Sequence, residues 1–323
     1  MSTCSTPVIE VVRGQIAAVA HARMTRNTPD ALLCDYEYNT LQEVHHFDAD
    51  LADAGIPFRR WLIGDVANPI AIAYCFRATW NTPRHTFWAH VRVAPNHQGQ
   101  GYGSQLLKTV HQWAASAGAQ RVRVMSHPHD GTVQFLMNHA YTQIGTEQLF
   151  SLQIGKQTLP VLQQYHDQLE IITLAELMAS HTDAVEQACV LHAAISLDVP
   201  MPDEPIVTLS KFRRLLGESV DPADYLIARR NGVLVGESIL MRDDDDAGVY
   251  WQHATGVLPA FRGQHIATRL KVAAIASASS RGARELRTWM ELSNQPIIQL
   301  NHALGFEELH EPGSKIHIFE MAL

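Results

Sequence analysis

The chain has 323 residues, of which 46% are hydrophobic and 18% charged, a balance that supports buried cores and excludes a largely disordered chain. Its 33 acidic residues outnumber 25 basic ones, for a net charge of −8, which argues against binding along a phosphate backbone. No apolar run could span a bilayer, the first residues lack a secretory signal, and the four cysteines are scattered. At about 150 residues per domain, we expect a cytoplasmic protein of two domains with no membrane or nucleic-acid partner.

The first half of the chain alternates between strand and helix patterns. Short apolar runs bounded by turn residues predict strands at 8–12, 58–63, 70–76, 86–93, 121–125 and 148–154. Apolar residues three and four positions apart predict helices at 16–24, 41–51, 101–117 and 132–139.

The second half repeats that order. Strands are predicted at 171–174, 225–229, 233–241, 249–257, 285–290 and 316–321, and helices at 175–194, 264–279 and 295–304. Each half is therefore predicted to be α/β (α+β), with a mixed twisted sheet flanked by helices.

The two halves also match residue by residue. Val93 and Val257, Pro95 and Pro259, and Gly99 and Gly263 are each 164 residues apart. Matches that keep their order along half of the chain indicate a duplicated domain rather than a short-period repeat. A polar segment with Gly and Pro separates the copies, so we expect domains at 6–158 and 168–323.

Each copy contains a strand that ends before a proline, a glycine-containing turn and a helix. The first amides of a helix lack internal partners and carry partial positive charge, so this joint can bind a phosphate or pyrophosphate. The alternative is a tight turn that needs glycine for its backbone angles. No GK[ST] follows, and the spacing at Gln98–Gly103 does not fit a dinucleotide fingerprint.

These joints resemble the Gln/Arg-x-x-Gly-x-Gly/Ala signature of the GNAT acyltransferase superfamily. Gln98, Gly101 and Gly103 fit it fully, whereas His265 replaces the central glycine in the second copy. The whole chain resembles tandem GNAT proteins, including the mycothiol-synthase-like two-domain group. Arg262 and Ala267 fit the signature, and Asn294 resembles the family's second motif.

The resemblance implies acetyl-CoA as co-substrate, with its diphosphate on the loop amides and its pantetheine arm along the preceding strand. The implied cofactor-binding residues are Val91, Val93, Gln98, Gly99, Gln100, Gly101, Tyr102, Gly103, Ser104, Thr255, Val257, Arg262, Gly263, Gln264, His265, Ile266, Ala267 and Asn294. Whether the loop with His265 still binds CoA stays open.

Acetyl transfer to an amine needs a base, because a free alkyl ammonium titrates near pH 10. Alternation along the strand puts Phe87, Ala89 and Val91 on the face of Val93, and none of them ionises. The same alternation puts Trp251, His253 and Thr255 on the face of Val257. His253 is therefore the candidate base, against the alternative of a hydrogen-bonded core histidine, and Glu237 is the reserve.

A general acid is harder to assign. The family often uses a tyrosine there, but Leu136 and Asn301 occupy the corresponding places. No metal site is predicted, because His45-His46 and His127-Pro128-His129 lack zinc spacing and the acidic run at 243–246 reads as a hairpin turn.

The sequence thus predicts an N-acetyltransferase that acts on a small-molecule amine by direct attack in a ternary complex. Domain one has the intact loop and domain two has the candidate base, so we expect binding in the first and chemistry in the second. Two alternatives stay open: a non-catalytic CoA-binding sensor or scaffold, and a protein lysine acetyltransferase. The oligomeric state is unknown.

Overall fold

The computed structural model describes residues 7–11, 44, 47–49, 51–52, 55–77, 81–82, 85–128, 130–155, 168–199, 204–205, 207–243 and 246–323. Its contacts divide the chain into two units. The N-terminal unit comprises residues 1–146 together with 315–323, and the C-terminal unit comprises residues 147–314.

The N-terminal unit is built on a mixed sheet, whose strand order is β1-β2-β3-β5-β6-β15-β7. The β5–β6 pair is parallel, and the β1–β2, β2–β3, β3–β5 and β6–β15 pairs are antiparallel. The strands of this sheet are β1 (Val8–Val11), β2 (Phe58–Gly64), β3 (Pro69–Arg77), β5 (Thr86–Val93), β6 (Arg121–Ser126), β7 (Thr142–Gln153) and β15 (Lys315–Ala322), and the short strand β4 (Asn81–Thr82) lies outside it.

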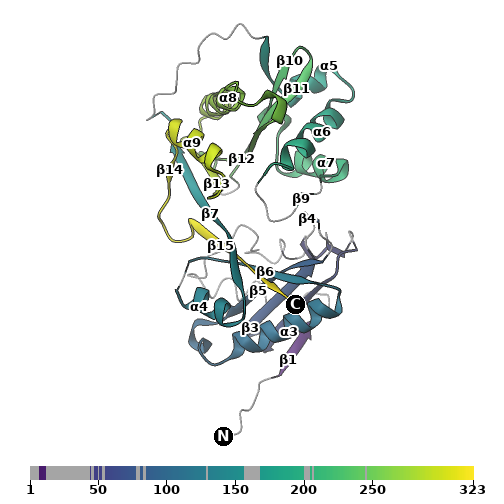
Figure 1. Cartoon of the computed structure of the whole chain (residues 1–323), viewed down its shortest axis with the longest axis vertical. Helices are drawn as coiled ribbons and strands as arrows, with labels where there is room; N and C mark the ends of the chain where they lie inside the picture. The colour runs from purple at the N-terminus through teal and green to yellow at the C-terminus, as the bar shows by residue number, and fades with distance from the viewer. Residues whose placement is uncertain are drawn as a thin grey trace. The chain divides into compact units, whose positions relative to one another are not determined.

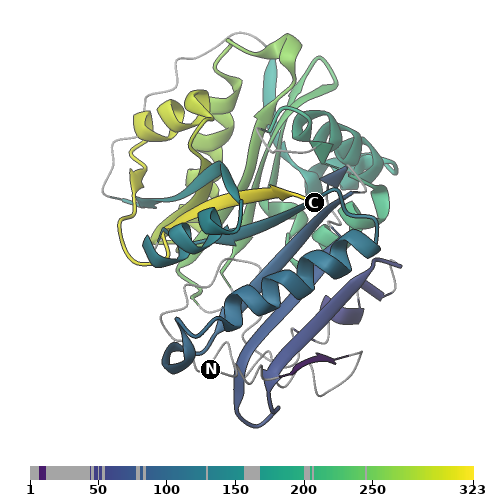
Figure 2. The same ribbon diagram turned by 60° about the horizontal axis from the view of Figure 1, so that its bottom comes forward.

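Helix α3 (Tyr102–Ser116) packs along one face of this sheet, as Figure 2 shows. Its apolar residues recur at helical spacing, so one face buries Leu106, Leu107 and Val110 against the strands. Gly118, at φ +89°, follows the end of the helix, where a left-handed residue is favourable. The described part of this unit also contains the 3-10 turn η1 (Pro95–His97) and helix α4 (Asp130–Asn138).

The strand order continues through the C-terminal unit as β7-β13-β12-β11-β10-β8, in which β12 and β13 are parallel. Figure 1 shows α8 and α9 on one side of this sheet and α5, α6 and α7 on the other. The strands are β8 (Leu169–Thr173), β9 (Glu204–Pro205), β10 (Tyr225–Arg230), β11 (Val233–Arg242), β12 (Val249–Val257), β13 (Glu285–Glu291) and β14 (Glu307–Glu308). The helices are α5 (Leu174–Ser180), α6 (Ala184–Ser196), α7 (Leu209–Glu218), α8 (Ile266–Ser280) and α9 (Gln295–Ala303), with 3-10 turns η2 (Pro222–Asp224) and η3 (Pro259–Phe261).

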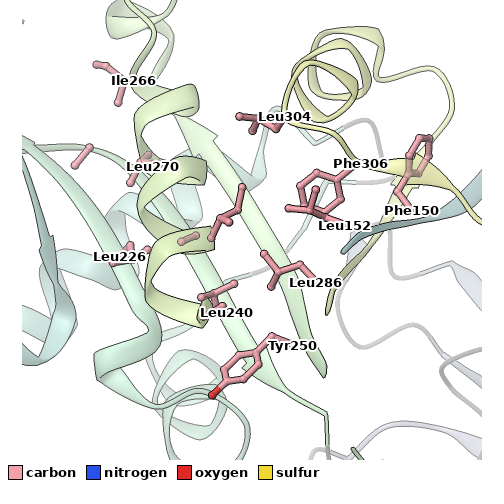
Figure 3. Packing of buried hydrophobic residues seen from close by; sticks show 14 of the residues in the cluster. Phe150, Leu152, Leu226, Leu240, Tyr250, Ile266, Leu270, Leu286, Leu304 and Phe306 are labelled. Carbon is pink, nitrogen blue, oxygen red and sulfur yellow. The ribbon is translucent and has the colours of Figure 1, made fainter. Parts of the chain in front are cut away.

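The main core of this unit lies between α8 and the sheet. Leu270 of α8 belongs to the same buried cluster as Leu226, Leu240 and Leu286 of three strands, and Figure 3 shows these side chains converging. A separate cluster on the other face joins α6 and α7 to β10 and β11. No helix in the described part of the chain is long and apolar enough to cross a membrane.

The observed elements follow most of the predicted order, with informative differences. The single helix predicted at 175–194 is two helices, because Thr182 and Asp183 form a turn, and Asp183 takes the N-cap position of α6 without a side-chain capping bond. Helix α7 was not predicted, and the predicted helix at 16–24 lies outside the described residues.

The expected domain boundaries and the observed division differ at the last strand of each repeat. Residues 147–153 of β7 pair with β13 and belong to the C-terminal unit, whereas β15 pairs with β6 and belongs to the N-terminal unit. The boundaries expected at 6–158 and 168–323 assigned these strands the other way, because sequence order alone cannot show which sheet a terminal strand joins.

Candidate functional site

Both units contain a pair of parallel strands that separates partway. Residues Thr86–Trp88 of β5 pair with β6, and residues Val249–Trp251 of β12 pair with β13. Beyond these short pairings, the described residues provide no strand partner for this edge of β5 or β12. The unpaired backbone amides and carbonyls can therefore bind an extended ligand as an added strand.

In the N-terminal unit the opened strand β5 leads into a loop rich in glycine. Gly99 and Gly101 have φ of +73° and +88°, and Gly101 caps α3. A Cβ at either position would meet no atom within 4 Å, so open space lies beside the loop. The first helical hydrogen bond runs from Gln105 N to Gly101 O, at 3.0 Å. The preceding amides therefore stay available to an anion.

The loop is fixed to its strand by side chains that the sequence had assigned to cofactor binding. The Gln98 side-chain amide donates to the Val93 carbonyl at 3.3 Å, and Gln100 donates to the Asn96 carbonyl at 3.2 Å. Gln98 and Gln100 thus hold the loop shape with their side chains, and the Gln98 backbone amide is itself bonded to the Pro95 carbonyl at 3.3 Å.

The C-terminal loop repeats this construction with different residues. Arg262 Nε donates to the Val257 carbonyl at 3.0 Å, which is the counterpart of the Gln98–Val93 bond, and its guanidinium also pairs with Asp198. His265 occupies the place of Gly101 and takes φ +57°, the left-handed region that histidine adopts more often than most residues. The loop backbone therefore keeps its course despite the missing glycine.

The other predicted binding residues differ in their surroundings. A Cβ on Gly103 would come within 3.1 Å of Phe135, so this glycine serves the packing of α3 against α4. Ser104 Oγ lies 2.9 Å from His139 Nε2. Tyr102 packs edge-on against His97, and Gln264 accepts a hydrogen bond from Arg230. Val91 and Val93 of the open strand pack on the core beneath α3.

Other predicted residues lie around the opened strand of the C-terminal unit. Ile266 is buried under the first turn of α8 and Ala267 packs on the same core. Asn294 is half-buried between β13 and α9 and makes no capping bond with its side chain. Its amide therefore lies where strand β13 ends and can still bind a ligand.

The N-terminal unit has no titrating side chain on the face of β5 that packs under α3. Phe87, Ala89, Val91 and Val93 share that face, as predicted. His90 lies on the other face, stacked on Tyr74 with ring centroids 4.4 Å apart. Burial and the charge of Arg60 lower the pKa of His90 to about 3, so its ring is neutral.

The C-terminal strand β12 corrects the predicted alternation. Ile239 pairs with Ala254 but Leu240 pairs with Gln252, so His253 is the extra residue of a β-bulge. Because of the bulge, the residues of β12 that precede His253 point to the opposite faces from those that the regular alternation predicts. Tyr250 rather than Trp251 therefore packs in the same buried cluster as Val257. The prediction that Trp251 shares a face with Val257 was wrong, because alternation counted along a sequence cannot register a bulge.

His253 itself lies close to two other titratable residues, Glu237 and His192. Its side chain is exposed, yet the protein around it removes enough hydration to lower its pKa. The charge of His192 acts in the same direction, and that of Glu237 opposes it. His253 is thus a neutral imidazole beside the opened strand.

Glu237, the predicted reserve base, is completely buried and has two hydrogen-bond partners. Tyr225 Oη donates to one carboxylate oxygen, and His192 Nδ1 lies 2.7 Å from the other. Burial and the neighbouring carboxylate raise the pKa of Tyr225, so its hydroxyl stays protonated. The sequence analysis did not identify His192. The one sign of a functional role in its sequence is that a histidine stands among the apolar residues of helix α6.

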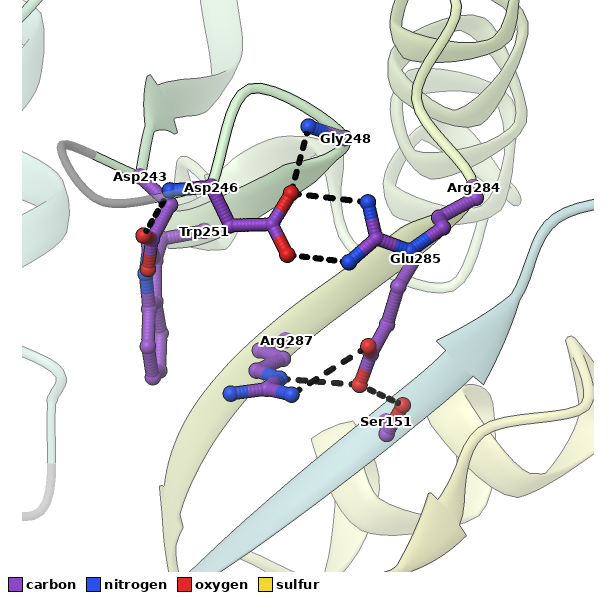
Figure 4. Close-up of polar contacts among 8 residues, drawn as sticks. All are labelled: Ser151, Asp243, Asp246, Gly248, Trp251, Arg284, Glu285 and Arg287. Atoms are coloured by element: carbon purple, nitrogen blue, oxygen red, sulfur yellow. Dashed lines mark hydrogen bonds and ion pairs between the residues drawn. The ribbon is translucent and has the colours of Figure 1, made fainter.

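The acidic hairpin and the histidine groups have separate roles. In Figure 4, Asp246 binds the Arg284 guanidinium and the Gly248 amide, and Asp243 accepts a hydrogen bond from Trp251 at 2.7 Å. His127 Nδ1 lies 2.8 Å from the Lys315 carbonyl oxygen. His45, His46 and His129 lie outside the described residues. Among the described residues, no cluster of three metal-ligating side chains occurs.

Comparison with protein families assigns both halves to one family. The model of the acetyltransferase (GNAT) family matches residues 24–138 and again 193–306. The chain therefore belongs to the GNAT acetyltransferase family, with one copy of the family domain in each half. It is an acetyltransferase by family and fold. No curated protein matches the chain.

Solved structures show the same tandem fold at low sequence identity. A GCN5-related N-acetyltransferase from Sphaerobacter thermophilus is 17% identical, with a TM-score of 0.68 over 98% of this chain and 95% of that one. A tandem GNAT protein from the clavulanic acid biosynthesis pathway is 14% identical, with a TM-score of 0.69 over 98% of both chains. These comparisons do not single out the mycothiol-synthase-like group.

Proposed function

We propose that this acetyltransferase uses acetyl-CoA and transfers the acetyl group to the amine of a small molecule, by direct attack in a ternary complex. The observation that carries the proposal is the open edge of β5 and β12, each followed by a loop whose amides converge at a helix start. The CoA diphosphate would bind amides from Gly99 to Ser104 or from Gly263 to Ala267. Its pantetheine arm would lie along Val91–Val93 or Thr255–Val257.

The C-terminal unit carries the chemistry in this proposal. Among the described residues, this unit alone has a fully buried carboxylate on the strand next to the opened one. Ala71 pairs with Val93 and Gly236 pairs with Val257, so Ile72 has the position in the N-terminal unit that Glu237 has in the C-terminal unit. Imidazoles beside the strand can take the ammonium proton, and a backbone amide near Val257 would stabilise the developing oxyanion. The N-terminal unit would bind acetyl-CoA with little turnover.

We place the reaction in the cytoplasm, because the buried Cys75 and Cys189 are free thiols and such thiols persist in reducing compartments. A small amine is favoured over a protein lysine because Glu237 is completely buried and its partner His192 is only 15% exposed.

Release of the CoA thiol with a panel of primary amines (benzylamine, ethanolamine, putrescine and glucosamine) tests this function. Two matched variants then test the division of labour. Gly99 and Gly263 have the same φ of +73° and open space at Cβ, so Gly99→Glu and Gly263→Glu bring equal strain and the same repulsive charge.

We expect Gly263→Glu to lower kcat/KM for acetyl-CoA at least tenfold and Gly99→Glu to leave turnover nearly intact. The opposite pattern would assign the chemistry to the N-terminal unit. Binding of acetyl-CoA without thiol release for any amine would favour a CoA-binding sensor instead.

A further inference from the structure

The side chains of Tyr225, His192 and Glu237 form an ordered chain of hydrogen bonds in the C-terminal unit. Glu237 is 0% exposed, and a buried carboxylate is stable only when its oxygens are hydrogen-bonded. Tyr225 Oη supplies one bond and His192 Nδ1 the other, at 2.7 Å. Tyr225 comes from the adjacent strand β10 and is itself fully buried, so this bond to Glu237 is shielded from solvent.

His192 is held so that one ring nitrogen is committed and the other is available. Phe212 packs against the ring with centroids 5.5 Å apart, and Nδ1 is committed to Glu237. The carboxylate accepts the proton of Nδ1, so in the neutral ring Nε2 carries the lone pair. Among the described residues Nε2 has no hydrogen-bond partner, and the side chain is 15% exposed.

The helix that carries His192 covers the opened strand. Ile195, one turn later on α6, packs directly on Gly256, and Gly256 pairs with Glu237 across β11 and β12. His192 therefore faces the strand section next to the bulge at His253. An amine that attacks an acyl group held along β12 from this side would meet both imidazoles.

The two imidazoles are not equivalent as proton acceptors. When one of the two imidazoles is protonated, its charge disfavours protonation of the other. The charge of His192 accordingly lowers the pKa of His253. His192 is bonded to a carboxylate, whereas His253 has only the more distant influence of that same group. Tyr225, which bonds the same carboxylate, and Cys189, one turn back on α6 and acting on Tyr225, belong to the same cluster.

We propose that His192 Nε2, rather than His253, accepts the proton of the acceptor ammonium, and that Glu237 is a positioning residue that orients His192 and stabilises its imidazolium. This inference rests on the proposed function. The freed amine attacks the thioester carbon, the N–C bond forms, and the C–S bond breaks with its electron pair leaving on sulfur. The second amine proton ends on the thiolate, and the first leaves His192 for solvent.

The test measures the pH dependence of kcat/KM with the best amine of the panel. His192→Ala should lower kcat by about 10²–10⁴-fold and flatten the acidic limb, and added imidazole should restore part of the rate. Glu237→Gln keeps a side chain of the same shape but removes the charge that favours the imidazolium, so its acidic limb should move to lower pH. His310→Ala, at an exposed histidine of the same unit, is the matched control.

Far-UV circular dichroism checks that each variant is folded. If His192→Ala does not fold, the shift of the acidic limb in Glu237→Gln decides the question alone. A wild-type pH profile in His192→Ala, or an unmoved limb in Glu237→Gln, would overturn the assignment, and loss of the limb in His253→Ala alone would return the role to His253. Absence of thiol release by the wild-type protein with every amine would instead refute the proposed function itself.

Discussion

A lysine in the core of the C-terminal unit gives a prediction about stability. Lys271 lies on α8 with 2% exposure, its ammonium donates to Gln252 Oε1, and it lies 5.4 Å from the centre of the Phe306 ring. Burial lowers the pKa of Lys271 to about 7. We expect Lys271→Met to stabilise the protein, because methionine fills a similar volume without a charge.

Two opposing effects set the size of this change. A pKa lowered from 10.5 to about 7 corresponds to a cost of about 5 kcal/mol for the buried charge, at about 1.36 kcal/mol per unit. The variant leaves Gln252 Oε1 without its donor, which costs about 1–3 kcal/mol. The net gain in the free energy of unfolding should therefore be about 2–4 kcal/mol near pH 6.

The gain in the free energy of unfolding should decrease as the pH rises. The folded pKa of Lys271 lies below its unfolded value, so the cost of burying the charge is complete below pH 7. It decreases as the pH rises from 7 and vanishes above 10.5. Urea unfolding at several pH values measures this, with Lys108→Met at an exposed lysine of α3 as control. A gain that does not change with pH, or a loss near pH 6, would refute the reasoning.

Three shorter predictions concern the ligand sites and packing. Gly101→Arg should weaken CoA binding to the N-terminal unit by orders of magnitude in a calorimetric titration, since charge-assisted bonds contribute about 1.5–3 kcal/mol each; unchanged affinity would contradict the diphosphate assignment. Acetyl-CoA at a hundredfold excess over Kd should stabilise by about 2.7 kcal/mol and raise Tm, whereas NAD should not. Gly256→Val should cost about 1–3 kcal/mol in chemical denaturation, because its Cβ would overlap Ile195; wild-type stability would mean that α6 yields there.

The fold was predictable where local pattern and tertiary packing agree. Helix α3 follows from Leu106, Leu107 and Val110 at helical spacing and from Gly118 at its end. The exchange of terminal strands was not predictable in the same way. Strands 142–153 and 315–322 have the pattern of any sheet strand, and which sheet each one joins depends on contacts far apart in sequence.

In the candidate site, too, the features set by local sequence were predictable and those set by side-chain contacts were predicted less well. The loop after β5 was predictable because Gly99 and Gly101 adopt angles that other residues rarely take, and glycine spacing records this in the sequence. The roles of Gln98 and Arg262 were predicted less well. Their side chains bind the carbonyls of Val93 and Val257, and therefore shape the loop.

In the titratable cluster of the C-terminal unit, the sequence analysis named His253 and Glu237 but not His192. It also did not foresee the one-residue bulge at His253. The bulge at His253 changes which side chains share a face of β12, so a count along the strand places Trp251 on the wrong side. His192 comes from a helix and lies 45 residues before Glu237 in the sequence, and only packing brings its Nδ1 to 2.7 Å from the Glu237 carboxylate. In the N-terminal unit an unbulged β5 pairs regularly with β3, and Ile72 stands where Glu237 does. Two copies of one domain can thus differ by a bulge and a single buried carboxylate, while both loops keep a left-handed residue at the start of the following helix.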